Sequence, residues 1–89
     1  MEYLKSVIPV IESNYVNFTT VERSIADFFI YNREQMDFSA KSVAGKLFVS
    51  EASLSRFAKK CGFRGYREFI YQYEENFVVR QDSMTGNTR

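Results

Sequence analysis

The chain has 89 residues, a net charge of +1 and no histidine. A chain of this length buries only about 60 to 65% of its unfolded surface, which suffices for one compact core and no second domain. The missing histidine removes Ser-His and Cys-His nucleophile pairs and the usual zinc sites, so we expect no catalytic residue, no metal and no cofactor.

The single cysteine, Cys61, is predicted to be a small buried apolar residue without a reactive thiol. One cysteine excludes an intrachain disulfide and fits a reducing cytoplasm. The longest apolar stretches, such as residues 28–31, are too short for a membrane span, and no signal peptide is visible. We therefore expect a cytoplasmic protein that is not an enzyme.

Two helices are predicted in the first third of the chain. The first begins at about Val7, because Pro9 lacks an N–H group and is tolerated only near a first helical turn. Thr19 and Glu22 have the spacing of a capping box, in which each side chain binds the other residue's backbone N–H. Apolar residues then recur at helical spacing over residues 21–29, which indicates a second helix.

A pair of helices joined by a tight turn follows, after a short helical turn predicted between Asn32 and Phe38. Ser39 can cap the first of the pair, and Ser50 can cap the second by accepting a backbone N–H two or three residues on. Gly62 suits the left-handed residue after the second helix. The apolar residues that would hold this pair to the domain are Val43, Ala44, Leu47, Val49, Leu54, Phe57 and Ala58.

The turn between these two helices departs from the usual pattern. Many helix-turn-helix segments have glycine there, whereas this chain has Phe48 in the turn and Gly45 inside the preceding helix. A left-handed backbone would cost Phe48 about 1 kcal/mol, and an interior glycine costs about as much relative to alanine. We keep the helix-turn-helix assignment, which requires Phe48 to make this turn.

The last predicted helix carries an apolar stripe from Tyr66 to Phe77, about three turns long. No strand alternation or hairpin turn is visible, so we expect an all-α fold, a compact bundle of about five helices containing a helix-turn-helix. Residues 1–79 would form this domain, and residues 80–89 a polar, disordered tail or linker.

Charge is distributed unevenly along the chain. Residues 41–67 hold seven of the twelve basic residues and one of the eleven acidic ones, so this segment carries +6 and the remainder −5. Such asymmetry indicates a polyanionic partner, although a solvated helix face is the alternative.

The outward face of the helix from about Glu51 to Lys60 suits the major groove of double-stranded DNA. Arg56 can pair bidentately with guanine, and Glu51 can either complement the helix dipole or accept from cytosine. Lys59, Lys60 and Arg64 are better placed for phosphates. The full set of predicted DNA-binding residues is Ser50, Glu51, Ala52, Ser53, Ser55, Arg56, Lys59, Lys60 and Arg64.

Three segments resemble a known family. SEASLSRF (residues 50–57) and KKCGFRGYREF (residues 59–69) resemble the N-terminal domain of RpiR-type bacterial transcription regulators, and FTTVERSIADF (residues 18–28) resembles the helix-opening motif of that family. The resemblance spans roughly residues 8–76. It implies a sequence-specific reader that controls genes of sugar and sugar-phosphate metabolism.

In regulators of this type, a sugar-isomerase-like domain that binds a phosphosugar follows the reader. No residue of this chain encodes that second domain, so the resemblance places a phosphosugar effector only on a domain absent from this chain. We expect a fragment of a longer regulator, with a member lacking its sensor as the alternative.

A homodimer is expected, because one helix in one groove buries only about 600 to 1,000 Å², and symmetric dimers gain affinity by reading two half-sites. The contact surface would be the first helix, residues 8–15, or the last, residues 71–77. The alternative function is a helical protein-interaction module whose basic face meets an acidic protein.

Overall fold

The computed structural model describes the backbone of residues 7–86 and the side chains of residues 7–76. Helices and loops account for all the backbone it describes, which confirms the predicted all-α bundle. The elements are α1 (Val7–Asn14), the 3₁₀ turn η1 (Tyr15–Asn17), α2 (Thr20–Tyr31), α3 (Ala40–Leu47), α4 (Glu51–Lys60) and α5 (Tyr66–Gly86).

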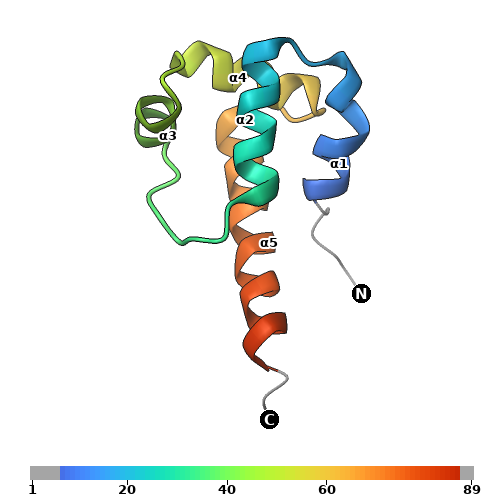
Figure 1. Ribbon diagram of the computed structural model, residues 1–89, viewed down its shortest axis with the longest axis vertical. Coiled ribbons are helices and arrows are strands. Elements are labelled where there is room, and N and C mark those ends of the chain that lie inside the picture. The colour runs from blue at the N-terminus through green and yellow to red at the C-terminus, as the bar shows by residue number, and fades with distance from the viewer. Residues whose placement is uncertain (1–6, 87–89) are drawn as a thin grey trace.

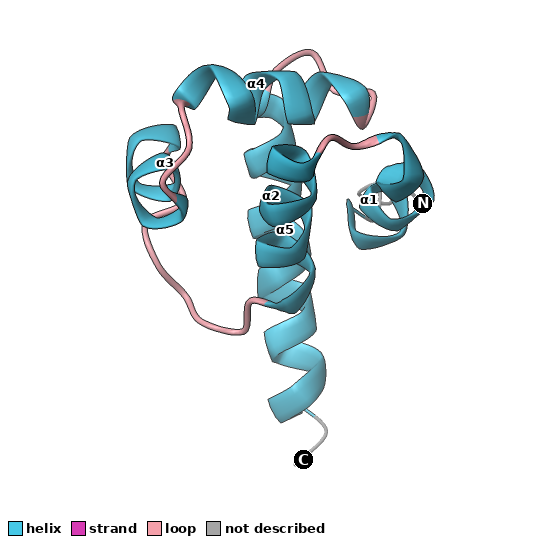
Figure 2. Cartoon of the chain, turned by 45° about the horizontal axis from the view of Figure 1, so that its top comes forward, coloured by secondary structure: helices cyan, strands magenta, loops and turns pink. Residues whose placement is uncertain are grey.

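The helices are arranged around α5, which forms the long axis of the molecule (Figure 1). In both views, α4 crosses one end of the molecule, while α1 and α3 lie on opposite sides of α2 (Figures 1 and 2). This arrangement leaves α4 at the end of the bundle, with one long side uncovered by other helices.

Aromatic rings fill the centre of this bundle. Phe29 of α2 is fully buried, and its ring centroid lies 4.9 Å from that of Phe69 and 4.8 Å from that of Tyr73, both on α5. Phe57 of α4 joins the same group, 5.3 Å from Phe69. Edge-to-face contacts of this kind stabilise a core beyond the area that they bury. The cluster fixes α2, α4 and α5 relative to one another.

The beginning of α2 has the predicted capping box. The Thr19 hydroxyl accepts the N–H of Glu22 at 3.2 Å, and Glu22 Oε1 accepts the N–H of Thr19 at 2.9 Å. Two N–H groups that a helix start leaves without intrahelical partners are thereby satisfied.

Serine caps begin the next two helices, as predicted. Ser39 accepts the N–H of Ser42 at 3.3 Å, and Ser50 accepts the N–H of Ser53 at 3.0 Å. The second cap starts α4 at Glu51, so both ends of α4 match the predicted range.

The end of α4 is a Schellman motif built around Gly62, which has φ of 96°. The N–H of Phe63 reaches the carbonyl of Ala58 at 3.1 Å, and the N–H of Gly62 reaches that of Lys59 at 3.0 Å. Phe63 is buried against the core, which is the hydrophobic contact that accompanies this motif.

Phe48 makes the turn between α3 and α4 in the left-handed conformation, with φ of 60° and ψ of 42°. The N–H of Val49 bonds to the carbonyl of Ala44 at 3.0 Å, so Phe48 occupies the place that glycine usually takes after a helix. Its side chain is 94% exposed. The left-handed backbone at Phe48 therefore carries the free-energy cost that the sequence indicates, and burial of the ring does not offset it.

The predicted helical turn between Asn32 and Phe38 is wrong. This segment is an irregular connection, because its side chains bind the backbone groups that a helix would use. Asn32 both donates to and accepts from the backbone of Glu34, and Asp37 accepts the N–H of Ser39 at 3.0 Å. Phe38 is buried, and its carbonyl accepts the hydroxyl of Tyr66 at 2.8 Å.

The backbone of α5 continues as helix to Gly86, beyond the predicted start of a polar tail at residue 80. The side chain of Phe77 and those after it lie outside the description, as does the backbone of residues 87–89. A domain boundary at residue 79 stays a prediction.

Candidate nucleic-acid interface

The two sides of α4 differ in burial, as a helix that reads DNA requires. Leu54, Phe57 and Ala58 are fully buried against the core. Most of the predicted site residues lie on the surface instead, with Ser55 half-buried; the exposed ones are Ser50, Glu51, Ala52, Arg56, Lys59, Lys60 and Arg64. Ser53 is the exception, since it is only 8% exposed.

The start of α4 has one feature that attracts an anion and one that repels it. The first N–H groups of a helix lack intrahelical partners, and the helix dipole makes this end partly positive. Here the end begins with Ser50 and Glu51, which are both exposed. Glu51 lies in the first turn, where a carboxylate complements the dipole. The N–H groups at this end therefore favour a phosphate oxygen, whereas the Glu51 carboxylate repels one.

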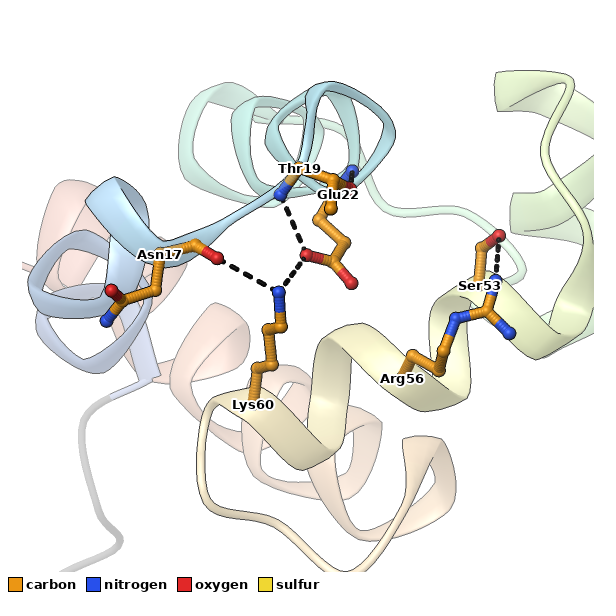
Figure 3. Close-up of polar contacts among 6 residues, drawn as sticks. All are labelled: Asn17, Thr19, Glu22, Ser53, Arg56 and Lys60. Atoms are coloured by element: carbon orange, nitrogen blue, oxygen red, sulfur yellow. Dashed lines mark hydrogen bonds and ion pairs between the residues drawn. The ribbon is translucent and has the colours of Figure 1, made fainter.

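Arg56 lies along α4 with its guanidinium directed back toward the start of the helix (Figure 3). Its Nη2 donates to Ser53 Oγ at 3.3 Å, and Ser53 Oγ lies 2.9 Å from Ser50 Oγ. The cap of the helix and the exposed arginine are thus joined through the buried Ser53 hydroxyl.

Lys60 points away from Arg56 and across to α2 (Figure 3). Its Nζ lies 2.8 Å from Glu22 Oε1 and donates to the carbonyl of Asn17 at 2.9 Å. Burial raises the pKa of Glu22, but the hydrogen bonds from Lys60 and Thr19 outweigh it, so the pKa of this carboxyl lies below its usual value. Glu22 is therefore charged at neutral pH, and Lys60 compensates that charge.

The helix-turn-helix domain of the rpiR family matches this chain over residues 5–78. This span includes α1 to α4 and much of α5. The chain belongs to the rpiR family. The predicted resemblance is thereby confirmed, and it places the chain among DNA-binding transcription regulators. No curated protein matches the chain.

Two of the predicted DNA-binding residues, Ser53 and Lys60, have hydrogen-bond partners within this rpiR-family domain. Ser53 is buried, and its hydroxyl lies within hydrogen-bond distance of Ser50 and Arg56. Helical spacing could have indicated this, because Ser53 precedes Leu54 and lies four residues before Phe57, on the inward side. Lys60 is engaged by Glu22, 38 residues away, and nothing local in the sequence signals that pairing.

Within the basic segment of this rpiR-family domain, residues 41–67, three further basic residues are exposed but absent from the predicted site. They are Lys41 and Lys46 on α3 and Arg67 in the first turn of α5. All three are among the seven basic residues counted in residues 41–67, so the charge distribution could have added them to the predicted site. Together with Arg56, Lys59, Lys60 and Arg64, they are the exposed basic residues of this segment.

Cys61 follows α4 and is buried, as predicted. Burial, together with the nearby carboxylate of Glu22, raises the pKa of its thiol to about 12. The nucleophilic thiolate is therefore almost absent at neutral pH.

Neither α5, with its 21 residues, nor any other helix that the structure describes is apolar over a length that could span a bilayer.

Proposed function

We propose that this rpiR-family domain reads a specific DNA sequence by placing α4 in the major groove. The observation that carries the proposal is the position of Arg56, which is exposed on α4 while Leu54 and Phe57 hold the opposite side in the core. An arginine so placed can donate two hydrogen bonds to guanine O6 and N7, the commonest specific contact in DNA complexes.

Phosphate contacts in this proposal come from the other exposed cations. Lys59 lies near the end of α4, and Arg64 follows it in the connection to α5. Such contacts set affinity and its dependence on salt, but they do not discriminate sequences. The resemblance to RpiR-type regulators supports target genes of sugar or sugar-phosphate metabolism.

The domain would bind palindromic DNA as a homodimer. Of the two surfaces that the sequence indicates, α1 directs Val7 and Ile11 into the core, whereas Tyr71 on α5 is 58% exposed. Exposure of this ring supports α5 as the contact surface. Light scattering of the domain on palindromic DNA tests the proposal, and a strictly monomeric complex would contradict it.

The test of the reading face begins with DNA selected from a random pool by the wild-type domain. Affinity for selected and unrelated DNA is then measured for the wild type and for Arg56→Ala over a range of salt concentrations. We expect Arg56→Ala to cost about 1 to 3 kcal/mol on selected DNA and to relax its base preference. An equal loss on all DNA would show that Arg56 is not the reader.

Arg33→Ala is the matched control, because it removes the same charge from an exposed arginine in the connection between α2 and α3, which leaves α2 at its end away from α4 (Figure 1). We expect its base preference to equal that of the wild type. The alternative, an acidic protein partner, predicts none of the steep salt dependence of DNA binding. With about five phosphate contacts, log K should fall with log salt at a slope of about −4 to −5.

A further inference from the structure

Three side chains form a line of hydrogen bonds along one side of α4. Ser50, Ser53 and Arg56 are spaced by three residues, so they follow one another along the helix surface. Ser50 Oγ lies 2.9 Å from Ser53 Oγ, and Arg56 Nη2 donates to Ser53 Oγ at 3.3 Å (Figure 3). The middle member is buried and the last one is exposed.

The burial of Ser53 determines what its hydroxyl can do. Ser53 is only 8% exposed, so little of its surface is open to a base edge, yet its hydroxyl accepts a hydrogen bond from the arginine one turn further on. An arginine without such a contact samples many rotamers, and it loses them when it binds DNA. A hydrogen bond made before binding removes part of that loss.

The contact with Ser53 leaves the reading capacity of Arg56 intact. A guanidinium has five N–H donors, and only one of them, on Nη2, is directed to Ser53. The remaining donors suffice for two parallel hydrogen bonds to guanine. The same contact can therefore persist in the DNA complex.

We propose that Ser53 is a positioning residue that orders Arg56 for base reading before DNA binds. This inference rests on the proposed function, because it assigns Ser53 a role only through Arg56. It predicts an effect on selected DNA and none on unrelated DNA, where phosphate contacts dominate.

Ser53→Ala tests this role with little disturbance of the fold. The cap survives, since Ser50 Oγ accepts the backbone N–H of residue 53 at 3.0 Å and that group is unchanged. The smaller alanine fits the space of serine. We expect about a threefold loss of affinity for selected DNA, the size expected when one long side chain must be ordered on binding. Affinity for unrelated DNA should stay at the wild-type value.

A double-mutant cycle with Arg56→Ala separates positioning from a structural effect. In the Arg56→Ala background, Ser53→Ala should change neither affinity, because no arginine remains to be ordered. Ser53→Thr keeps the hydroxyl, so with Arg56 present it should bind selected DNA as the wild type does, without the loss seen for Ser53→Ala. Thermal unfolding verifies that each variant folds.

Several results would overturn the inference. Unchanged or tighter binding of selected DNA by Ser53→Ala would mean that the hydrogen bond does not help Arg56, or restrains it. A loss that persists without Arg56 would mean that Ser53 acts through the fold. If Arg56→Ala abolishes base preference while Ser53→Ala does not alter it, only this inference fails; if Arg56→Ala leaves base preference intact, the proposed reading face fails as well.

Discussion

Lys60 Nζ lies 2.8 Å from Glu22 Oε1, so the last turn of α4 is joined to the first turn of α2. The same oxygen accepts the backbone N–H of Thr19. One carboxylate therefore serves both the start of α2 and the attachment of α4. The Glu22 side chain is 7% exposed and that of Lys60 40%, so water screens this pair only partly.

Lys60→Ala is expected to lower the free energy of unfolding by about 1 to 2 kcal/mol, since a hydrogen bond to a buried charged group is lost and water screens only part of it. Urea unfolding measures this effect. Lys59→Ala is the control: its side chain is exposed, so stability should change by less than about 0.5 kcal/mol.

The two lysines should also differ in DNA binding. Lys59→Ala should reduce the salt slope by about 0.9, the effect of one phosphate contact, whereas Lys60→Ala should leave the slope nearly unchanged. If both variants flatten the slope equally, Lys60 exchanges Glu22 for phosphate when DNA binds.

The free energy of unfolding is expected to fall in acid, because the Glu22 carboxylate becomes protonated there. The pKa of this carboxyl in the folded state is below its ordinary value of 4.5, so the unfolded chain takes up a proton first as pH falls. The stabilisation is fully present above pH 4.5 and is lost as pH falls through the folded pKa. Glu22→Gln should be less stable at pH 7 and should lose less stability on acidification, as measured by urea unfolding at each pH. Parallel curves for the two proteins would assign the acid sensitivity to other carboxyls, of which Asp37 is one with a lowered pKa.

Phe48→Gly should stabilise the domain by about 1 kcal/mol, because glycine adopts the left-handed backbone without the steric cost that Phe48 bears. Phe48→Ala is the control, since alanine keeps the strain and the ring contributes almost no buried area; it should lie within about 0.5 kcal/mol of the wild type. Thermal unfolding compares the three proteins. A destabilised glycine variant would mean that the ring contributes more than its exposure indicates.

Gly45→Ala should stabilise α3 by about 0.5 to 1 kcal/mol, the helix-propensity difference between the two residues. A Cβ added at Gly45 meets nothing within 4 Å, so the methyl group has room. The measurement is the midpoint of thermal unfolding. A lower midpoint would indicate that α3 needs the flexibility of glycine in the folded state.

Sequence alone could predict the features of this fold that depend on neighbouring residues. The Thr19 and Glu22 box, the Ser39 and Ser50 caps and the Gly62 ending each involve residues within five positions of one another, and all are confirmed. The irregular connection after α2 was mispredicted, because Asn32 and Asp37 bind backbone groups that a helix would otherwise use.

The site was harder to predict where it depends on tertiary contacts. Lys60 looks like a phosphate ligand in a basic segment, and only the fold brings the buried Glu22 to it. Serine can hydrogen-bond to a base or a phosphate, but Ser53 lies on the inward side of α4. DNA binding by the exposed residues remains a prediction, and the Arg56→Ala variant is its most direct test.

Phe29 has a mechanical consequence for the domain. Its ring touches those of Phe57 on α4 and of Phe69 and Tyr73 on α5, and all four are fully buried. Rings packed at this density cannot slide past one another by small steps. A twist of α5 about its own axis would therefore carry α4 with it as a rigid unit, so the orientation of the long helix sets the angle at which α4 would enter a groove in the proposed complex.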